Sequence, residues 1–191
     1  LTVEHGDKSI TAKKFEKQAQ KMGMEVFLSD FKGVSLTFDD GKYSIKDKNN
    51  SMEFSSKETV VFVRGTPTRD SHLDLISELE RIGCTCINNR TTISICADKY
   101  RSYVRMKDFK LNQPKTVLVP TEDDIDTALE ELDTKFPIIL KTLRGAGGVG
   151  VLFVESKRAL DSLVQLIYKQ DPETDILIQE YIKTDFDVRV V

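Results

Sequence analysis

A glycine-rich segment at residues 145–150 constrains the fold of this chain more than any other feature. It reads Gly145-Ala146-Gly147-Gly148-Val149-Gly150, and apolar runs at residues 138–143 and 151–154 flank it. Glycine permits backbone conformations and close approaches that a Cβ atom prevents, so such a loop can direct several amide groups at one anion. The sequence therefore predicts a strand, a phosphate-binding loop and a returning strand. A flexible hairpin turn is the simpler interpretation, but a turn needs fewer glycines.

The residues around the loop exclude three other kinds of glycine-rich site. A dinucleotide-binding loop opens a helix, whereas residues 151–154 are typical of a strand. A protein-kinase loop is followed by a lysine on a later strand, and no lysine occurs here before Lys157. A Walker A loop ends in Gly-Lys-Ser/Thr, and this loop ends in Gly150-Val151. The remaining pattern has its lysine, Lys141, ahead of the glycines.

Lys141 stands inside the apolar run at residues 138–143. An ammonium group without a partner is costly in such surroundings, and an anion such as a phosphate would compensate it. The alternative is an edge strand from which the lysine side chain extends to water.

Residues 97–191 are predicted to form an α+β domain. The expected elements are a helix at 93–106, strands at 115–119, 138–143, 151–154 and 176–181, a helix that begins at a capping box of Thr121 and Asp124, and a helix capped by Ser156. Their order mixes hairpin and crossover connections.

Residues 1–96 are predicted to form a doubly wound α/β domain, because strands and helices alternate. The expected elements are a strand at Thr2-Val3, a helix at 14–22 with Phe15, Ala19 and Met22 on one stripe, a strand at 25–28, a hairpin through Asp40-Gly41, a strand at 60–63 buried on both faces, a helix capped by Ser71 and closed by Gly83, and a strand at 84–87. Two small domains fit a chain of 191 residues.

Charge and hydropathy narrow the range of partners. Lys and Arg total 28 against 31 Asp and Glu, without the basic excess typical of nucleic-acid or anionic-membrane binders. The apolar runs fall short of the roughly 20 residues that cross a bilayer, and no signal-peptide pattern opens the chain. We therefore expect a cytoplasmic protein with no nucleic-acid or membrane partner.

The cysteines indicate free thiols. Cys84, Cys86 and Cys96 are odd in number, and neither His5 nor His72 is spaced with them as zinc ligands would be. Buried free thiols in a reducing compartment are the expectation.

A second polar constellation follows the last predicted strand. Glu180 ends that strand, and Asp187 and Arg189 alternate along the next run. The two carboxylates could accept hydrogen bonds from an adenine amino group and from ribose hydroxyls. Alternatively, they pair with Arg189 or Lys183.

Taken in order, these segments resemble the ATP-grasp superfamily and, within it, the RimK-like glutamate ligases. The residues that carry the resemblance are Asn88-Asn89-Arg90, Asp98-Lys99, Gln113-Pro114-Lys115-Thr116, Phe136-Pro137 with Lys141, the glycines of 145–150, Gln179-Glu180-Tyr181-Ile182 and Asp187-Val188-Arg189. The resemblance covers about the last hundred residues well and residues 1–87 only by their α/β pattern. It implies a Rossmann-like pre-ATP-grasp domain at 1–96 and the first, nucleotide-binding lobe of an ATP-grasp domain at 97–191.

The resemblance also implies roles for individual residues. Lys99 and Lys141 would contact the phosphates of ATP, although an exposed helix lysine is the plainer interpretation of Lys99. The flap over the phosphates would use Gly145, Gly147, Gly148 and Gly150. The adenine hinge would consist of Glu180, Tyr181 and Ile182, with Asp187 at the ribose and Arg189 facing phosphate or substrate.

The activity that the resemblance implies is that of an ATP-dependent carboxylate-amine ligase. A carboxylate is phosphorylated to an acylphosphate, and an amine such as glutamate then displaces phosphate to form an amide. The Mg²⁺ ligands and the second lobe are expected beyond residue 191, so the chain is expected to be a fragment that is inactive alone. Catalytic residues remain unassigned, and a homo-oligomer remains open.

Two other functions stay open at this point. The first is a nucleotide-binding regulatory or scaffold protein that has the fold without ligase activity. The second is an α/β domain with a glycine-rich hairpin and no nucleotide.

Overall fold

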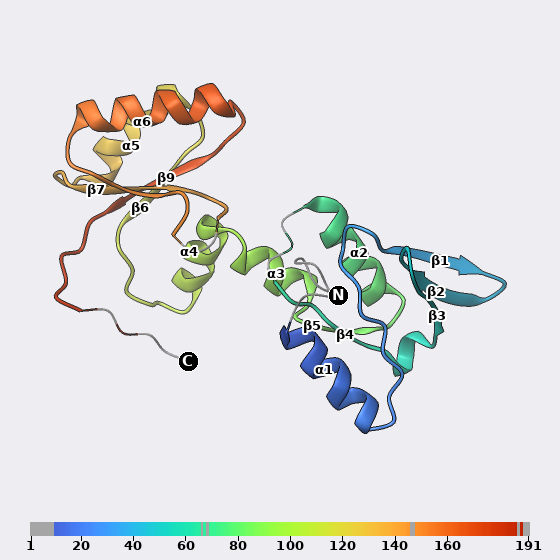
Figure 1. Ribbon diagram of the computed structural model, residues 1–191. Coiled ribbons are helices and arrows are strands. Elements are labelled where there is room, and N and C mark those ends of the chain that lie inside the picture. The colour runs from blue at the N-terminus through green and yellow to red at the C-terminus, as the bar shows by residue number, and fades with distance from the viewer. Residues whose placement is uncertain (1–9, 66, 68, 146–147, 187, 189–191) are drawn as a thin grey trace. The chain divides into compact units, whose positions relative to one another are not determined.

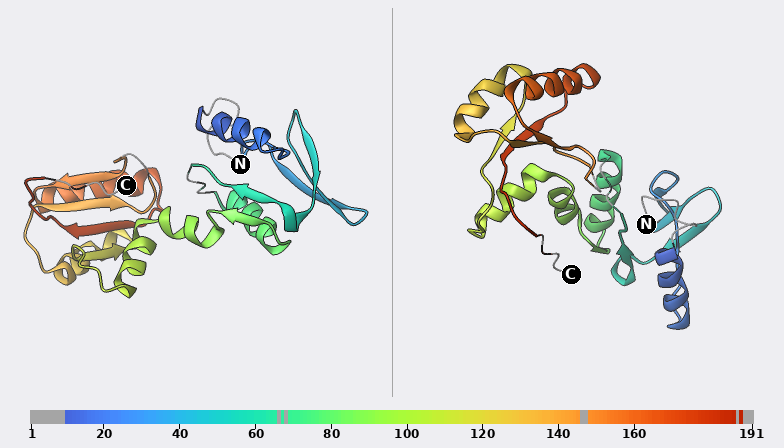
Figure 2. Two further views of the ribbon diagram at one scale, coloured as in Figure 1. Left: turned by 90° about the horizontal axis from the view of Figure 1, so that it is seen from below. Right: turned by 60° about the vertical axis from the view of Figure 1, so that its left-hand side comes forward.

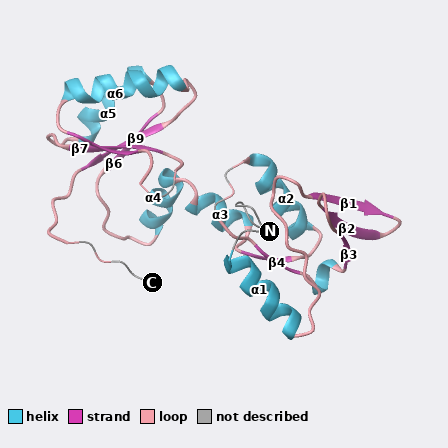
Figure 3. Cartoon of the chain, viewed as in Figure 1, coloured by secondary structure: helices cyan, strands magenta, loops and turns pink. Residues whose placement is uncertain are grey.

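The computed structural model describes residues 10–186 and 188, apart from 66, 68 and 146–147, and divides the chain into two compact units, Leu1–Ala97 and Asp98–Val191 (Figure 1). Both units contain helices and strands (Figure 3), which agrees with the predicted α/β class. No helix in the described ranges is long and apolar enough to cross a membrane.

The N-terminal unit contains a three-stranded antiparallel sheet and a separate pair of parallel strands. Its elements are α1 (Ile10–Lys21), β1 (Ser35–Asp39), β2 (Lys42–Lys46), β3 (Ser51–Phe54), η1 (Ser56–Glu58), β4 (Val60–Phe62), α2 (Asp70–Arg81), β5 (Thr85–Ile87) and α3 (Arg90–Cys96). The predicted hairpin is confirmed: Asp40 and Gly41 link β1 to β2 with φ angles of 46° and 79°. These left-handed conformations suit the twist of a two-residue hairpin turn.

Helices lie on both faces of the β4–β5 pair. Val61 packs into a core with Ile76 and Leu79 of α2, while Phe62 meets Phe15 of α1 with ring centroids 5.5 Å apart. Because successive residues of a strand point to opposite faces, β4 is layered between the two helices. This layering is the arrangement expected of an α/β unit.

Several details of the N-terminal unit differ from the predictions. Residues 25–28 form no strand, while β3 was not predicted at all. The helix α2 begins at Asp70 after an N-cap at Arg69 that makes no side-chain capping bond, so the predicted cap at Ser71 is wrong. Thr2-Val3 lies outside the described residues.

Burial in this unit also departs from prediction. Val60 is 52% exposed and Phe62 is 45% exposed, so β4 is not buried on both faces; within the described residues it pairs only with β5. On α1 the buried residue is Ala12, and the proposed stripe of Phe15, Ala19 and Met22 is largely exposed. All three cysteines are free, but Cys96 is exposed rather than buried.

The C-terminal unit is a four-stranded antiparallel sheet in the order β6-β9-β7-β8. Its elements are α4 (Lys99–Asp108), β6 (Thr116–Val119), η2 (Glu122–Asp124), α5 (Ile125–Leu132), β7 (Ile138–Thr142), β8 (Val151–Val154), α6 (Lys157–Gln170) and β9 (Ile176–Glu180). Within this unit, α5 and α6 cover one face of the sheet, and α4 lies on the other side (Figures 1 and 2).

Alternation along the strands separates a core face from an open face. Ile138 and Leu140 of β7 and Ile176 and Ile178 of β9 have no exposed surface and pack against α5 and α6. The residues that alternate with them, such as Lys141 and Gln179, therefore point to the opposite face, named the open face, where Leu177 is nevertheless buried.

The predicted helix at 93–106 is two helices. The helical conformation is interrupted at Ala97 and Asp98. The Asp98 side chain accepts a hydrogen bond from the backbone N–H of Arg101 and so caps α4. Ser156 caps α6 as predicted. The helix after Thr121 also forms, but Thr121 donates its hydroxyl to Asp124 and a short 3₁₀ turn precedes α5.

A buried histidine lies in the N-terminal unit. His72 is 6% exposed, stacks on Phe31 with ring centroids 5.0 Å apart, and leaves Nδ1 without a hydrogen-bond partner in the described part of the chain. Burial lowers the pKa of His72, and the charges of Arg69 and Lys32 lower it further, against a smaller opposing effect of Asp30.

We predict that this unit loses stability as the pH falls from about 7 to about 5. The unfolded chain takes up a proton at the ordinary histidine pKa, near 6.5, whereas the folded unit resists protonation until a lower pH. The substitution His72→Gln should remove that part of the pH dependence. Chemical denaturation of both proteins at pH 7 and pH 5 tests this, and equal pH dependence in the two would contradict it.

Candidate functional site

The glycine loop joins β7 to β8 on the C-terminal unit, so the predicted strand, loop and strand are confirmed. The backbone N–H of Thr142 donates to Gly150 O at 2.9 Å, and the N–H of Val151 donates to Gly148 O at 3.2 Å. The first bond anchors the returning end of the loop to β7, and the second closes a turn within the loop. Ala146 and Gly147 lie outside the described residues.

Two positions of the loop require glycine for steric reasons. A Cβ atom on Gly145, where φ is 142°, would lie 2.6 Å from Val149 O. A Cβ atom on Gly150, where φ is 76°, would collide with the hydroxyl oxygen of Thr142. Gly148 also has a positive φ, but open space surrounds it. The backbone therefore packs against the end of β7 more closely than a side chain would allow.

Lys99, the first residue of α4, reaches this same end of β7. Its Nζ donates to Thr142 O at 2.9 Å, and its backbone N–H donates to Leu143 O at 3.0 Å. Nζ also lies 3.7 Å from the point that a Cβ on Gly145 would occupy. Lys99 is half-buried at the loop, so the interpretation as an exposed helix lysine is wrong.

Lys141 lies on β7, on the sheet face opposite the α5 and α6 core. Its Nζ donates to Gln179 Oε1 at 2.5 Å, and Gln179 Nε2 donates in turn to Thr116 Oγ1 at 2.6 Å. Because β7 lies between β9 and β8, it is an interior strand, and the edge-strand interpretation of Lys141 is wrong.

Electrostatics favour an anion at the end of β7. Burial lowers the pKa of Lys99, against a smaller opposing effect of Asp98. Burial also lowers the pKa of Lys141, and the positive charge of Lys99 lowers it further. Among the described side chains, no carboxylate forms an ion pair with either lysine. A bound phosphate would relieve both the desolvation and the mutual repulsion.

The predicted hinge residues follow β9. The Glu180 carboxylate accepts a hydrogen bond from the backbone N–H of Lys115 at 2.7 Å, and the Glu180 N–H donates to Lys115 O at 2.9 Å. Glu180 thus connects the end of β9 to the start of β6 and forms no ion pair with Lys183 in the described structure.

An aromatic surface accompanies the hinge. The Tyr181 and Phe153 rings meet edge to face, with centroids 5.0 Å apart and an interplanar angle of 80°. Tyr181, Phe153 and Ile182 are 40%, 52% and 51% exposed. Phe153 pairs in register with Ile139, so it shares the open face with Lys141. Exposed aromatic and aliphatic groups of this kind suit a planar, weakly polar ring.

The structure brings together Lys99, Lys141, Gly145, Gly148 and Gly150 at one end of β7. The predicted residues Gly147, Asp187 and Arg189 lie outside the described residues, so their roles stay predictions.

Sequence reasoning did not select Gln179, Thr116 or Phe153 as site residues. Gln179 and Thr116 both belong to motifs of the family resemblance, and the further signal for Gln179 is a polar residue that follows the apolar run of β9. Only the register shows that Gln179 lies opposite Ile139, next to Lys141 on the open face.

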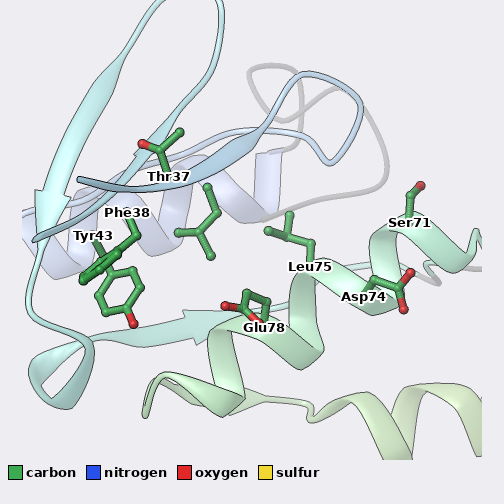
Figure 4. Close-up of a pocket in the computed structure, with 8 residues that line it drawn as sticks. Thr37, Phe38, Tyr43, Ser71, Asp74, Leu75 and Glu78 are labelled. Carbon is green, nitrogen blue, oxygen red and sulfur yellow. The ribbon is translucent and has the colours of Figure 1, made fainter. Parts of the chain in front are cut away.

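A separate hollow of about 350 Å³ lies in the N-terminal unit, between the β1–β2 hairpin and α2 (Figure 4). Leu36, Phe38 and Leu75 line it together with Asp74 and Glu78. It contains none of the predicted site residues.

A metal site is not assembled in the described ranges, where no three His, Cys, Asp or Glu residues come together.

Comparison with known proteins gives a family match over the C-terminal unit. A model of the RimK-like ATP-grasp domain matches residues 96–191. A “Probable alpha-L-glutamate ligase” of Coxiella burnetii is 30% identical over 108 residues, which are 56% of this chain and 35% of that protein. “Beta-citrylglutamate synthase B” of Danio rerio is 27% identical over 165 residues, which are 83% of this chain and 39% of that protein.

A solved structure extends the likeness to both units. The crystal structure of a RimK domain protein ATP-grasp from Sphaerobacter thermophilus matches with a TM-score of 0.70. It is 18% identical, and the match covers 96% of this chain and 64% of that one. At this identity the match supports the fold, and it confirms the expected α/β architecture. The segments that match this chain make up well under half the length of the two curated relatives.

We predict that alanine is tolerated unequally in the glycine loop. The substitution Gly150→Ala should lower the free energy of unfolding by at least about 2 kcal/mol, because strain at positive φ adds to a collision with Thr142. In the matched control Gly148→Ala, only the strain remains, and the loss should be about 1 kcal/mol. Guanidinium denaturation measures both, and equal losses would contradict the steric argument.

Proposed function

This chain belongs to the RimK-like ATP-grasp family, and on that premise we propose that it is the nucleotide-binding part of an ATP-dependent carboxylate-amine ligase. In this proposal, residues 1–96 are the pre-ATP-grasp domain and residues 97–191 are the first lobe of the ATP-grasp domain. The names of both curated relatives contain glutamate, which supports glutamate as the amine substrate. The carboxylate then belongs to a peptide, a protein or a small acid.

The convergence of Lys99, Lys141 and the glycine loop at the end of β7 carries this proposal. Phosphoryl transfer relies on positioning and charge neutralisation more than on covalent chemistry by the protein. Two desolvated ammonium groups and a close-packed loop backbone fit a triphosphate. Lys99 and Lys141 would bind the phosphates, and the backbone of 145–150 would cover them and exclude water.

The base of the nucleotide would use the aromatic surface. Tyr181, Ile182 and Phe153 expose apolar area on or next to the open sheet face, beside backbone groups of the strand end. An adenine ring would pack on that area and bond to the backbone around Glu180, with Asp187 at the ribose. Arg189 would face the phosphates or the carboxylate substrate.

The proposed reaction forms an amide in two steps. The carboxylate of one substrate attacks the terminal phosphoryl group, which yields an acylphosphate and ADP. The amine of the second substrate then attacks the acyl carbon and releases phosphate. This chain would orient the triphosphate and offset its charge in the first step.

Magnesium would supply further charge neutralisation when it is bound. In this proposal the ligands of the metal belong to the second lobe of the ATP-grasp domain. We therefore expect the 191-residue chain to bind nucleotide without turning it over, in the cytoplasm, where free thiols persist.

We predict that ATP binds the chain and that each site lysine contributes to affinity. Lys141→Ala and Lys99→Ala should each weaken binding about tenfold or more, because each removes a charge-assisted hydrogen bond worth roughly 1.5–3 kcal/mol. Calorimetric titration measures this effect. The control Lys169→Ala removes an exposed lysine of α6 and should bind ATP like the wild type.

GTP is the second control, because the hinge should favour adenine. Equal affinities for ATP across the wild type and both lysine variants would contradict the phosphate roles. A wild-type chain that binds neither ATP nor ADP would contradict the proposed nucleotide site.

A further inference from the structure

Three side chains form one hydrogen-bonded row across the open face of the C-terminal sheet. Lys141 on β7 donates to Gln179 on β9, and Gln179 donates to Thr116 on β6. The Thr116 hydroxyl donates to Pro114 O at 2.9 Å. The row thus crosses three neighbouring strands and ends on a backbone carbonyl.

The hydrogen bonds of this row can be donated in one direction only, from Lys141 toward Pro114 O. A carbonyl oxygen accepts, so the single hydroxyl proton of Thr116 is committed to Pro114 O. Thr116 Oγ1 must then accept from the amide nitrogen of Gln179, which turns Gln179 Oε1 toward Lys141. Lys141 can only donate. Thr116 and Lys141 therefore require the same orientation of the Gln179 amide, and Thr116 holds that orientation from the side away from the ammonium.

The acceptor that holds Lys141 is neutral, and this distinguishes it from another half-buried lysine of the same unit. Lys157 pairs with the carboxylates of Asp126 at 2.8 Å and Asp161 at 2.5 Å, and the hydrogen bonds to these carboxylates raise its pKa. At Lys141 the carboxamide of Gln179 orients one N–H of the ammonium, and no carboxylate among the described residues compensates its charge. Within the described part of the chain, two N–H donors of Lys141 are left for another partner.

We propose that Gln179, oriented by Thr116, is a positioning residue that aims the Lys141 ammonium at a nucleotide phosphate without neutralising it. This inference rests on the proposed function, because the phosphate is that of the nucleotide. A glutamate at position 179 has nearly the same shape but would pair with the ammonium and compete with the phosphate for it.

The test compares ADP binding to the full chain and its variants by calorimetry. Gln179→Glu should weaken ADP binding at least tenfold. Thr116→Val removes the hydroxyl that orients the amide and should weaken binding about threefold. The control Gln165→Glu makes the same change of charge at an exposed position of α6 and should leave the affinity unchanged. Thermal unfolding midpoints show whether each variant folds.

A second readout follows the ammonium directly in the absence of nucleotide. Lysine resonances are followed by NMR through a pH titration, and Lys141→Arg identifies the signal. Gln179→Glu should raise the pKa of Lys141, because a carboxylate stabilises its charged form, whereas Gln165→Glu should not. A loss of structure alone would not produce a selective rise at one lysine.

The outcomes separate this inference from the proposed function. If the wild type binds ADP and Lys141→Ala weakens it, but Gln179→Glu binds as the wild type does, the positioning role is overturned and the nucleotide site stands. An unchanged Lys141 pKa in Gln179→Glu also overturns the inference. A folded wild type that binds no ADP contradicts the proposed function and the inference together.

Discussion

The register between β7 and its two neighbours is the constraint on which the rest of the C-terminal unit depends. It sets Ile138 and Leu140 against the helices α5 and α6, where they have no exposed surface. The same alternation sends Lys141 to the opposite face, next to Gln179. A shift by one residue would bury the ammonium in the core and expose the core residues. Packing of the core therefore holds Lys141 and Gln179 in place on the opposite face.

The second constraint is the close approach of the glycine loop to the end of β7. Glycines at 145 and 150 let the backbone occupy space that a Cβ atom would fill. The carbonyl of Thr142 remains accessible to the Lys99 side chain. Lys99 is the first residue of α4, which begins after the N-cap at Asp98. The end of β7, the returning end of the loop and the start of α4 thus meet through hydrogen bonds to backbone carbonyls, and the Lys99 ammonium lies at that junction.

Much of this arrangement was predictable because it depends on local patterns. The hairpin at Asp40-Gly41, the strands on either side of residues 145–150 and the cap at Ser156 each follow from a few neighbouring residues. The predictions that were wrong concern features that depend on residues farther apart in the sequence or on the packing of whole elements. The strand at 60–63 is exposed on part of its surface because it has one described partner strand. The helix at 93–106 is interrupted where Asp98 caps a new helix rather than continuing the old one.

The sequence by itself determined two strands joined by a glycine loop, the lysine ahead of that loop, and the family resemblance. Each of these features depends on a short, contiguous segment. Only the tertiary structure decided which residues meet. Thr116, Lys141 and Gln179 are 25 to 63 positions apart in sequence, and they form one row because β9 pairs with both β6 and β7. Strand order and register are set by the packing of the whole core, which no local pattern contains.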